Sequence, residues 1–389
     1  MNNFDFQIKT KIIFGKDRQK EVGRILKEYG ARKVLVFIGQ GSVRKSGLLD
    51  EVLKCLENEQ IEFKVLEGIR PNPNIVLTRE FVKIAKEYNP DFLLPIGGGS
   101  VIDTAKSVAV GYYYDGDCFD FNMHLLSPQK ALPIGSILTI SAAGSEMSTS
   151  CVIQDDSTMI KRGFNSELIR PVFAIENPEL TYSVSQRQTI NGIVDIMMHT
   201  MERYFQPSSD NELADGFAEG LLKSVIKAGG KVIDNPMDYD SRAVLMLASS
   251  LSHNGMTFIG KSAFMPVHQL EHALSGVYPE VAHGAGLAVL FPAWAKYYVN
   301  VDIDKFDLFA RNVFGLNNPN KLENGKAGID ALVKFFKSIH APLTFKELGL
   351  DNPDIEKLLD ALFDGGKKEI PHNIKPMNRE IARIIYESC

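Results

Sequence analysis

The sequence predicts an α/β domain over residues 1–184, built on a mostly parallel sheet, and an all-helical domain over residues 185–389. Short apolar runs alternate with amphipathic stretches through the first half, as in successive βαβ units. From Ser185 onward the pattern is helical almost throughout. The length of 389 residues also exceeds what one hydrophobic core usually serves, so two domains are expected.

The positions of the apolar runs predict the elements of the first domain. The first 15 residues alternate polar and apolar side chains and are expected to form a strand or hairpin. Buried strands are expected at residues 33–39, 63–68, 91–100 (where the strand runs into a glycine turn), 132–141 and 171–176. Amphipathic helices are expected at residues 46–60, 72–88 and 101–114.

Composition excludes several classes of protein. Apolar residues make up 44% and charged residues 23% of the chain, which is ordinary for a globular protein. The net charge of −5 supplies no broad basic surface, so neither nucleic acid nor an anionic membrane is expected as a partner. No stretch has the length of a membrane span, and the N-terminus lacks the pattern of a signal peptide.

The cysteines favour a reducing compartment. They lie far apart and show no CxxC spacing, at Cys55, Cys118, Cys151 and Cys389. This pattern is typical of reduced thiols, which predicts a cytoplasmic location and argues against a thiolate metal site.

A glycine turn between a strand and a helix is a candidate phosphate site. Gly97, Gly98, Gly99 and Ser100 stand at this position, where glycines allow close approach and a helix N-terminus offers N–H groups to an anion. The turn is not the GxGxxG fingerprint, and such turns are about as often merely tight turns. A second run of small and hydroxyl residues, 139–146, could line a cofactor groove or be a polar loop.

The second half contains a candidate metal site. Asp195 and His199 lie four residues apart in an apolar helix, as do His268 and His272, and His283 follows eleven residues later. Residues four apart share a helix face, and each such group is costly on an apolar helix unless it is hydrogen-bonded or bound to metal. A structural role is the commoner one for any single histidine, but all of them together favour a site for Fe(II) or Zn(II). The other histidines are predicted to be structural: His124, His253, His340 and His372.

At these motifs the chain resembles the iron-containing (group III) alcohol dehydrogenase family, most of all its butanol dehydrogenase and broad-range aldehyde reductase branch. The segments GIVDIMMHTMERYF, HQLEHALSG, VAHGAGLAVLFP and LLPIGGGSVIDTAKSVA carry the resemblance. It implies a nucleotide-binding α/β domain, a helical domain and hydride transfer between a nicotinamide dinucleotide and a small alcohol or aldehyde. The implied metal ligands are Asp195, His199, His268 and His283, with His272 as a candidate proton relay.

The resemblance also implies the cofactor contacts. Gly98, Gly99 and Ser100 match the pyrophosphate turn, and Asp103 matches a residue near the nicotinamide, which makes it a candidate catalytic residue beside His272. The remaining contacts are on the adenosine or ribose side, at Asn72, Thr139, Ser141 and Lys161. Much of the family has proline before the last histidine where this chain has Ala282.

The turn after the second strand favours NADP(H) over NAD(H). NAD-selective enzymes commonly place a carboxylate there to accept from the ribose hydroxyls. This chain has Gly39, Gln40, Gly41 and Ser42, with two basic residues just beyond. The alternative is a flexible glycine turn beside solvated basic residues.

Three other functions compete with this interpretation. A lyase resembling dehydroquinate synthase would also use NAD and a divalent metal, but residues 243–300 offer only Lys261 and Lys296 to an anionic substrate. Aromatic and methionine side chains in the same segment, Trp294 among them, favour an apolar substrate such as butanol or butanal. Glycerol dehydrogenase and a non-catalytic metal-binding protein remain as further alternatives. The family resemblance also implies a homodimer.

Overall fold

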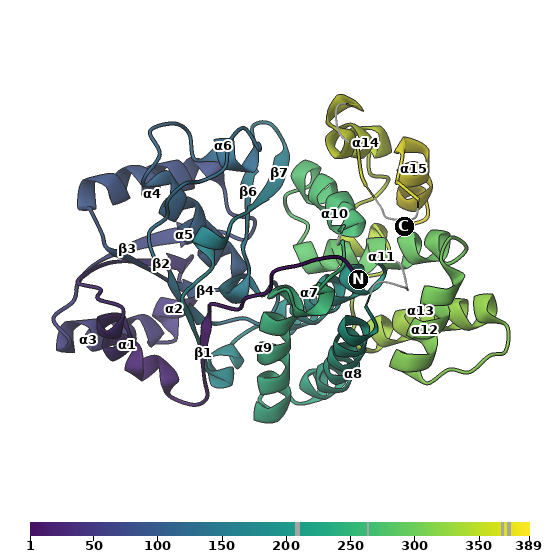
Figure 1. The fold of residues 1–389 in the computed structure, drawn as a ribbon, viewed down its shortest axis with the longest axis horizontal. Helices are drawn as coiled ribbons and strands as arrows, with labels where there is room; N and C mark the ends of the chain where they lie inside the picture. Colours follow the sequence, from purple (N-terminus) through teal and green to yellow (C-terminus); the bar gives the residue numbers. More distant parts are fainter. Residues whose placement is uncertain (207–210, 263, 367–368, 372–374) are drawn as a thin grey trace. The chain divides into compact units, whose positions relative to one another are not determined.

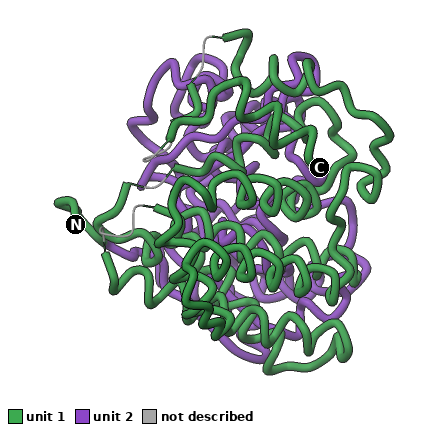
Figure 2. Tube along the Cα trace, turned by 90° about the vertical axis from the view of Figure 1, so that its right-hand side faces the viewer, with its two compact units in different colours: residues 1–6, 185–389 green, residues 7–184 purple. Residues whose placement is uncertain are grey.

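The chain folds into two compact units in a computed structural model that describes residues 1–389 except 207–210, 263, 367–368 and 372–374. One unit comprises residues 7–184, and the other comprises residues 185–389 together with residues 1–6 (Figure 2). The first six residues thus group with the helices, and not with the predicted α/β domain that includes them.

The unit of residues 7–184 contains a six-stranded sheet in which every neighbouring pair is parallel. The strand order is β1-β8-β5-β4-β2-β3, and this arrangement confirms the predicted fold class. The strands are β1 (Lys11–Phe14), β2 (Lys33–Gly39), β3 (Glu62–Ile69), β4 (Phe92–Gly97), β5 (Gly135–Leu138) and β8 (Phe173–Glu176). Strand β4 is buried along its whole length, as expected for a parallel sheet covered on both faces.

Alternating side chains of β2 pack into two different cores. Val34, Val36 and Ile38 join the core that contains helices α1 and α3, whereas Leu35 and Phe37 join the core that contains α4 and α5. The helices of this unit are α1 (Val22–Glu28), α2 (Ser42–Lys45), α3 (Leu48–Asn58), α4 (Ile75–Tyr88), α5 (Gly99–Gly111) and α6 (Phe119–Asn122) (Figure 1). The sheet is therefore covered by helices on both faces.

Two features of this unit differ from the sequence-based prediction. Only Lys11–Phe14 of the first 15 residues forms a strand. An antiparallel hairpin, β6 (Ser150–Asp155) and β7 (Ile160–Asn165), was not predicted. Strand β7 is polar and mostly half-buried, so it lacks the apolar pattern that marks the strands of the parallel sheet.

The second unit is a helical bundle around one large core. Its helices are α7 (Gln186–Tyr204), α8 (Glu212–Asp234), α9 (Tyr239–His253), α10 (Pro266–Val277), α11 (His283–Tyr298), α12 (Ile303–Phe314), α13 (Lys321–Ser338), α14 (Ile355–Phe363) and α15 (Arg379–Glu387). Helix α7 packs against α8, α9 and α11 and is buried on all sides from Gly192 to Tyr204. An all-round buried helix is normally apolar, so the polar residues of α7 are notable.

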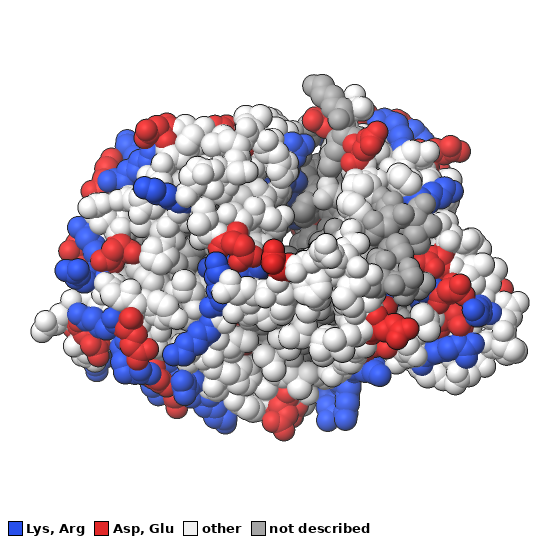
Figure 3. All heavy atoms as spheres, viewed as in Figure 1, with Lys and Arg blue, Asp and Glu red and all other residues white. Residues whose placement is uncertain are grey.

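None of the described helices combines the length and apolarity needed to cross a membrane. On the face shown in Figure 3, basic and acidic side chains are interspersed.

Two glycines allow α11 to approach its neighbours. A Cβ atom at Gly284 would lie 2.2 Å from the backbone oxygen of Asn191 in α7, and one at Gly286 would lie 2.9 Å from Cγ of Glu271 in α10. The start of α11 is thus held against α7, one turn away from Asp195.

We expect Gly284→Ala to destabilise the protein by about 1–3 kcal/mol, because the new methyl group meets backbone that must move. Gly230→Ala is the matched control: it also lies within a helix, its Cβ would meet nothing within 4 Å, and it should stabilise by up to about 1 kcal/mol. The measurement is urea unfolding followed by circular dichroism. Equal stability of the two variants would contradict the close approach of α11 to α7.

Candidate functional site

One face of α7 presents a row of polar groups to the core. Asp195, His199 and Glu202 follow at spacings of four and three residues, so their side chains lie along the same face. All three are buried.

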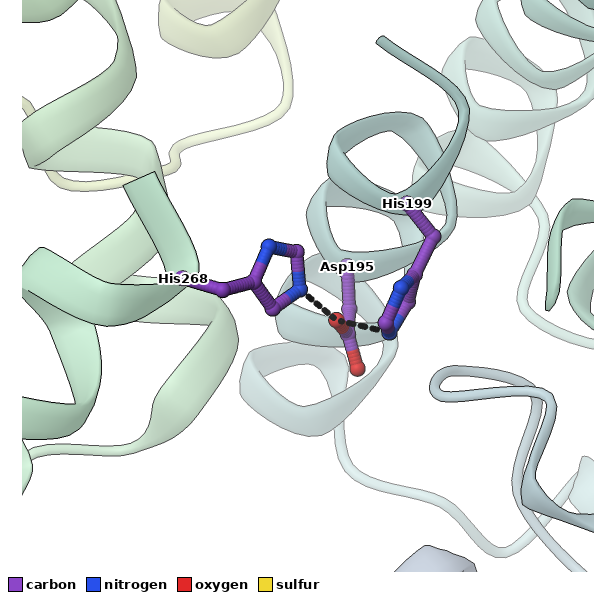
Figure 4. Close-up of side chains that lie close together, drawn as sticks. All are labelled: Asp195, His199 and His268. Atoms are coloured by element: carbon purple, nitrogen blue, oxygen red, sulfur yellow. Dashed lines mark ion pairs between the residues drawn. The ribbon is translucent and has the colours of Figure 1, made fainter. Parts of the chain in front are cut away.

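The four predicted metal ligands come together around one carboxylate oxygen. Oδ1 of Asp195 lies 3.4 Å from Nε2 of His199, 4.0 Å from Nε2 of His268 and 3.8 Å from Nε2 of His283. Figure 4 shows Asp195 and His199 projecting from α7 toward His268 on α10. His283 is the first residue of α11. Three imidazoles from three helices thus turn the same ring nitrogen toward a single point.

Two glutamates that were not predicted as site residues lie behind these imidazoles. Oε2 of Glu202 contacts Nδ1 of His268, and Oε2 of Glu271 contacts Nδ1 of His283. Both contacts involve the ring nitrogen remote from Asp195.

His199 has a different environment. Its Nδ1 lies 3.3 Å from Nη1 of Arg203, which also donates to the His199 backbone oxygen at 2.5 Å. The ring of His253, predicted to be structural, lies against it with centroids 4.1 Å apart. Burial, and then the neighbouring His253 and His268, hold the pKa of His199 well below its usual value, so this imidazole is neutral.

His272 lies beside this group. Its ring centroid is 6.4 Å from that of His268 and 5.7 Å from that of His283. Glu271, His272 and His283 each offer one ligand atom, and these three atoms lie within 4.8 Å of one another. Asp195, His199 and His268 form a second group by the same criterion. His272 is half-buried, whereas His268 is buried. His372 lies outside the described residues.

The residues fit a divalent cation. Nε2 of His268 is buried and makes no hydrogen bond to a described residue, which is costly without a ligand. Asp195, Glu202, Glu271 and Arg203 supply three carboxylates and one guanidinium, a formal charge of −2 that a divalent ion would balance. Neutral imidazoles with one carboxylate are the donors that Zn(II) and Fe(II) accept.

The predicted cofactor residues gather at the carboxyl edge of the sheet in the other unit. The strand order reverses at β2, which pairs with β3 on one side and β4 on the other. In open α/β sheets, ligands bind at such a switch point. Gly39 ends β2, Gly97 ends β4, and Thr139 follows β5, with its N–H donating to the Gly97 oxygen at 3.1 Å.

Close packing, and not a left-handed backbone conformation, explains why glycine is needed at positions 97 and 98. A Cβ at Gly97 would lie 2.6 Å from Val101, and one at Gly98 would lie 2.3 Å from Ile140. Gly99 and Ser100 then open α5, whose N-cap residue Gly98 has no side chain to occupy the helix N-terminus.

The other predicted contacts surround this edge. Gly41 has a left-handed φ of 118°, and Gln40 and Ser42 beside it are exposed. Asn72 lies in the turn after β3, also at a left-handed φ, of 54°. Ser141 is half-buried in the loop after β5. Lys161 pairs in β7 with Gln154, whose N–H donates to the oxygen of Pro73 next to Asn72.

Asp103 is engaged by the protein itself. Its two oxygens accept from Ser145 Oγ at 2.5 Å and from the Val152 N–H at 2.9 Å. Burial raises the pKa of Asp103. Lys106, a fully buried lysine not singled out from the sequence, donates to Ser145 Oγ at 2.9 Å and to the Ser150 oxygen at 2.7 Å. These contacts favour a role in holding residues 145–152, and the catalytic role of Asp103 stays a prediction.

Comparison with known proteins identifies the family on both halves of the chain. The model of the iron-containing alcohol dehydrogenases matches residues 9–178, and that of the C-terminal part of the Fe-containing alcohol dehydrogenase family matches residues 189–389.

Full-length relatives agree with these matches. The NADH-dependent butanol dehydrogenase A of Clostridium acetobutylicum is 38% identical and aligns over 100% of this chain and 99% of the relative. The NADPH-dependent aldehyde reductase YqhD of Escherichia coli is 34% identical over 100% of both chains. The crystal structure of NADH-dependent butanol dehydrogenase A from Thermotoga maritima has a TM-score of 0.95 at 35% identity, covering 100% of this chain and 98% of that one.

The resemblance drawn from the histidine and glycine motifs is thereby confirmed. With both halves matched and relatives aligned over the whole length, the chain belongs to the iron-containing alcohol dehydrogenase family.

Proposed function

We propose that this oxidoreductase moves hydride between NADP(H) and a small primary alcohol or aldehyde, such as butanol or butanal. The metal, Fe(II) or Zn(II), would be held by Asp195, His199, His268 and His283. The observation that carries the proposal is the convergence of three Nε2 atoms on Oδ1 of Asp195. When bound there, a divalent ion supplies a Lewis acid for a carbonyl oxygen.

The residues around this centre would have separate roles in metal binding, proton exchange and coenzyme binding. The imidazoles of His199, His268 and His283 would bind the ion together with Asp195. His272, half-buried beside His268 and His283, would exchange a proton with solvent. The dinucleotide pyrophosphate would lie at Gly98, Gly99 and Ser100, against the start of α5.

An uncharged substrate suits the helical unit. Lys261, one of two lysines in residues 243–300, is buried against Asp215, which also accepts from Lys305 at 2.5 Å. That lysine is therefore not available to an anionic substrate, which argues against a lyase acting on carboxylate and phosphate. Trp294, one of the apolar side chains of this segment, packs in the core and stacks on Tyr298 with ring centroids 4.8 Å apart. The relatives described above are named as butanol dehydrogenases and an aldehyde reductase, which favours these substrates over glycerol.

Replacing His283 and His272 separately should distinguish a metal ligand from a proton relay. We expect His283→Ala to lose the metal and the activity, because one of four donors is removed. His272→Ala should keep roughly one divalent ion per chain. It should nevertheless lose rate by about 10²–10⁴-fold, as expected for a missing general acid or base. Elemental analysis and aldehyde-dependent cofactor oxidation are the measurements.

His340→Asn is the matched control, because His340 is exposed and has a left-handed φ of 61° that asparagine tolerates. It should change neither metal content nor rate. Metal loss in His272→Ala would make His272 a ligand. Wild-type activity that survives exhaustive chelation, with no metal detected, would overturn the metal proposal.

The turn after β2 supports a preference for NADP(H). No carboxylate stands at residues 39–42. Arg44 beyond the turn is paired with Glu67 at 2.8 Å, which weakens its attraction for a phosphate. The proposal therefore depends mainly on the absence of a carboxylate that would repel the 2′-phosphate. A carboxylate about 4 Å from a phosphate charge would repel it by up to about 4 kcal/mol at a surface dielectric. The relatives include both NADH- and NADPH-dependent enzymes, so their names do not decide between the coenzymes.

We expect a higher kcat/KM with NADPH than with NADH for one aldehyde, and Gly39→Asp should shift the ratio toward NADH. A Cβ at Gly39 would lie 3.3 Å from the Ile69 oxygen, so Gly39→Ala is needed as a control for steric effects. The alanine variant should leave the coenzyme ratio unchanged even where it lowers both rates. A clear wild-type preference for NADH would refute the proposal.

We further propose that the enzyme is a cytoplasmic homodimer. The described cysteines are all free thiols, which supports a reducing compartment. Size-exclusion chromatography with light scattering should give twice the mass of one chain, and a monomer at working concentration would contradict the dimer.

A further inference from the structure

Two fully buried carboxylates stand outside the proposed ligand set. The side chains of Glu202 and Glu271 are 0% exposed, and burying a charged carboxylate is costly without strong partners. The proposed reaction assigns neither of them a role.

Glu202 holds His268 by both its backbone and its ring. Its Oε1 accepts from the N–H of Val267 at 2.6 Å, and its Oε2 accepts from the N–H of His268 at 3.2 Å and contacts Nδ1 of the same residue. These N–H groups belong to the first turn of α10, which begins at Pro266 and has no side-chain cap of its own. An ionised carboxylate at a helix N-terminus is favourable because of the helix dipole. Glu202 therefore places α10 on α7 and sets the ring of His268.

Glu271 acts on a different helix. It extends from α10 to Nδ1 of His283 at the start of α11, and Gly286 leaves room for its side chain. A side chain at position 286 would displace Glu271, because the Cβ would lie 2.9 Å from its Cγ.

A carboxylate at Nδ1 determines what Nε2 can do. An ionised carboxylate only accepts hydrogen bonds, so the proton of a neutral imidazole is held on Nδ1 and the lone pair is left on Nε2. For His268 and His283, Nε2 is the nitrogen that faces Asp195. His199 has a different neighbour at Nδ1, since the Arg203 guanidinium 3.3 Å away cannot accept a hydrogen bond and cannot hold a proton on that nitrogen.

We propose that Glu202 and Glu271 are positioning residues that act through His268 and His283 and set the affinity of the centre for its metal. Each holds the Nδ1 proton, orients the ring and makes Nε2 a stronger donor. This inference rests on the proposed metal centre.

The test is the metal affinity of Glu202→Gln and Glu271→Gln. Glutamine keeps the volume and an accepting oxygen but removes the charge. Zn(II) affinity would be measured by competition with a chromophoric chelator, on protein stripped of metal and then reloaded. We expect each variant to bind Zn(II) about 10–100-fold more weakly than wild type. The visible spectrum of the Co(II)-loaded protein should also change, because the orientation of an imidazole ligand changes.

Glu219→Gln is the matched control. Glu219 is a half-buried carboxylate of α8 that accepts from Tyr204 at 2.9 Å and from Asn312 at 2.8 Å, away from the imidazoles. The Zn(II) affinity and the Co(II) spectrum of the Glu219→Gln variant should equal those of wild type. Thermal unfolding of the stripped proteins shows whether each variant is folded. If one glutamate variant does not fold, the other tests the proposal alone, because their histidines differ.

The outcomes separate the two proposals. Wild type that binds neither Zn(II) nor Co(II) would overturn the metal centre itself. Wild type that binds both, with folded glutamate variants of unchanged affinity and spectrum, would overturn the positioning role and leave the metal centre standing.

Discussion

The placement of a buried carboxylate, two buried imidazoles and one half-buried imidazole in an apolar helical core is the constraint on which the helical unit depends. Each such group needs a partner that offsets lost hydration. The structure supplies these partners across helices: Glu202 of α7 contacts His268 of α10, and Glu271 of α10 contacts His283 of α11. Because each carboxylate belongs to a different helix from its imidazole, the same contacts that satisfy the polar groups also join α7 to α10 and α10 to α11.

Periodicity predicted most of the α/β unit because its strands bury both faces and its helices are amphipathic. The strand 33–39 coincides with β2, and the strands 63–68 and 171–176 lie within two residues of β3 and β8. The hairpin of β6 and β7 was missed because β7 is polar and its pairing, not its composition, makes it a strand. The helix at Val22–Glu28 was also missed: it has only seven residues, too few for a periodic signal.

Site residues were predicted where their spacing along the chain is short, and were missed where only the fold brings them together. Asp195 with His199, and His268 with His272, are visible because a spacing of four residues is local. Glu202 shares the face of Asp195, but its partner His268 lies 66 residues further along the chain, so only the fold reveals its role. His253 at the end of α9 contacts His199 through tertiary packing alone. An acidic residue on an otherwise apolar helix was the available signal, and it applied to Glu202 as much as to Asp195.

The N-caps of the helices differ between those that present His268 and His283 and most of the other helices in the helical unit. In the helical unit, α7–α9 and α12–α15 each have an Asn, Asp or Ser side chain that accepts from the first turn. Helices α10 and α11 lack such a cap, and these are the helices that present His268 and His283. For α10 the missing cap is replaced by Glu202, so one carboxylate satisfies the helix N-terminus and the imidazole together.

Helix α5 of the other unit also begins without a side-chain cap, at Gly98, where Ile140 leaves no room for a Cβ. There the N–H of Val101 donates to the Gly98 oxygen at 3.0 Å, so the proposed pyrophosphate contact would use the N–H groups of Gly99 and Ser100. In each unit, then, the proposed site includes the start of a helix that has no N-cap side chain of its own.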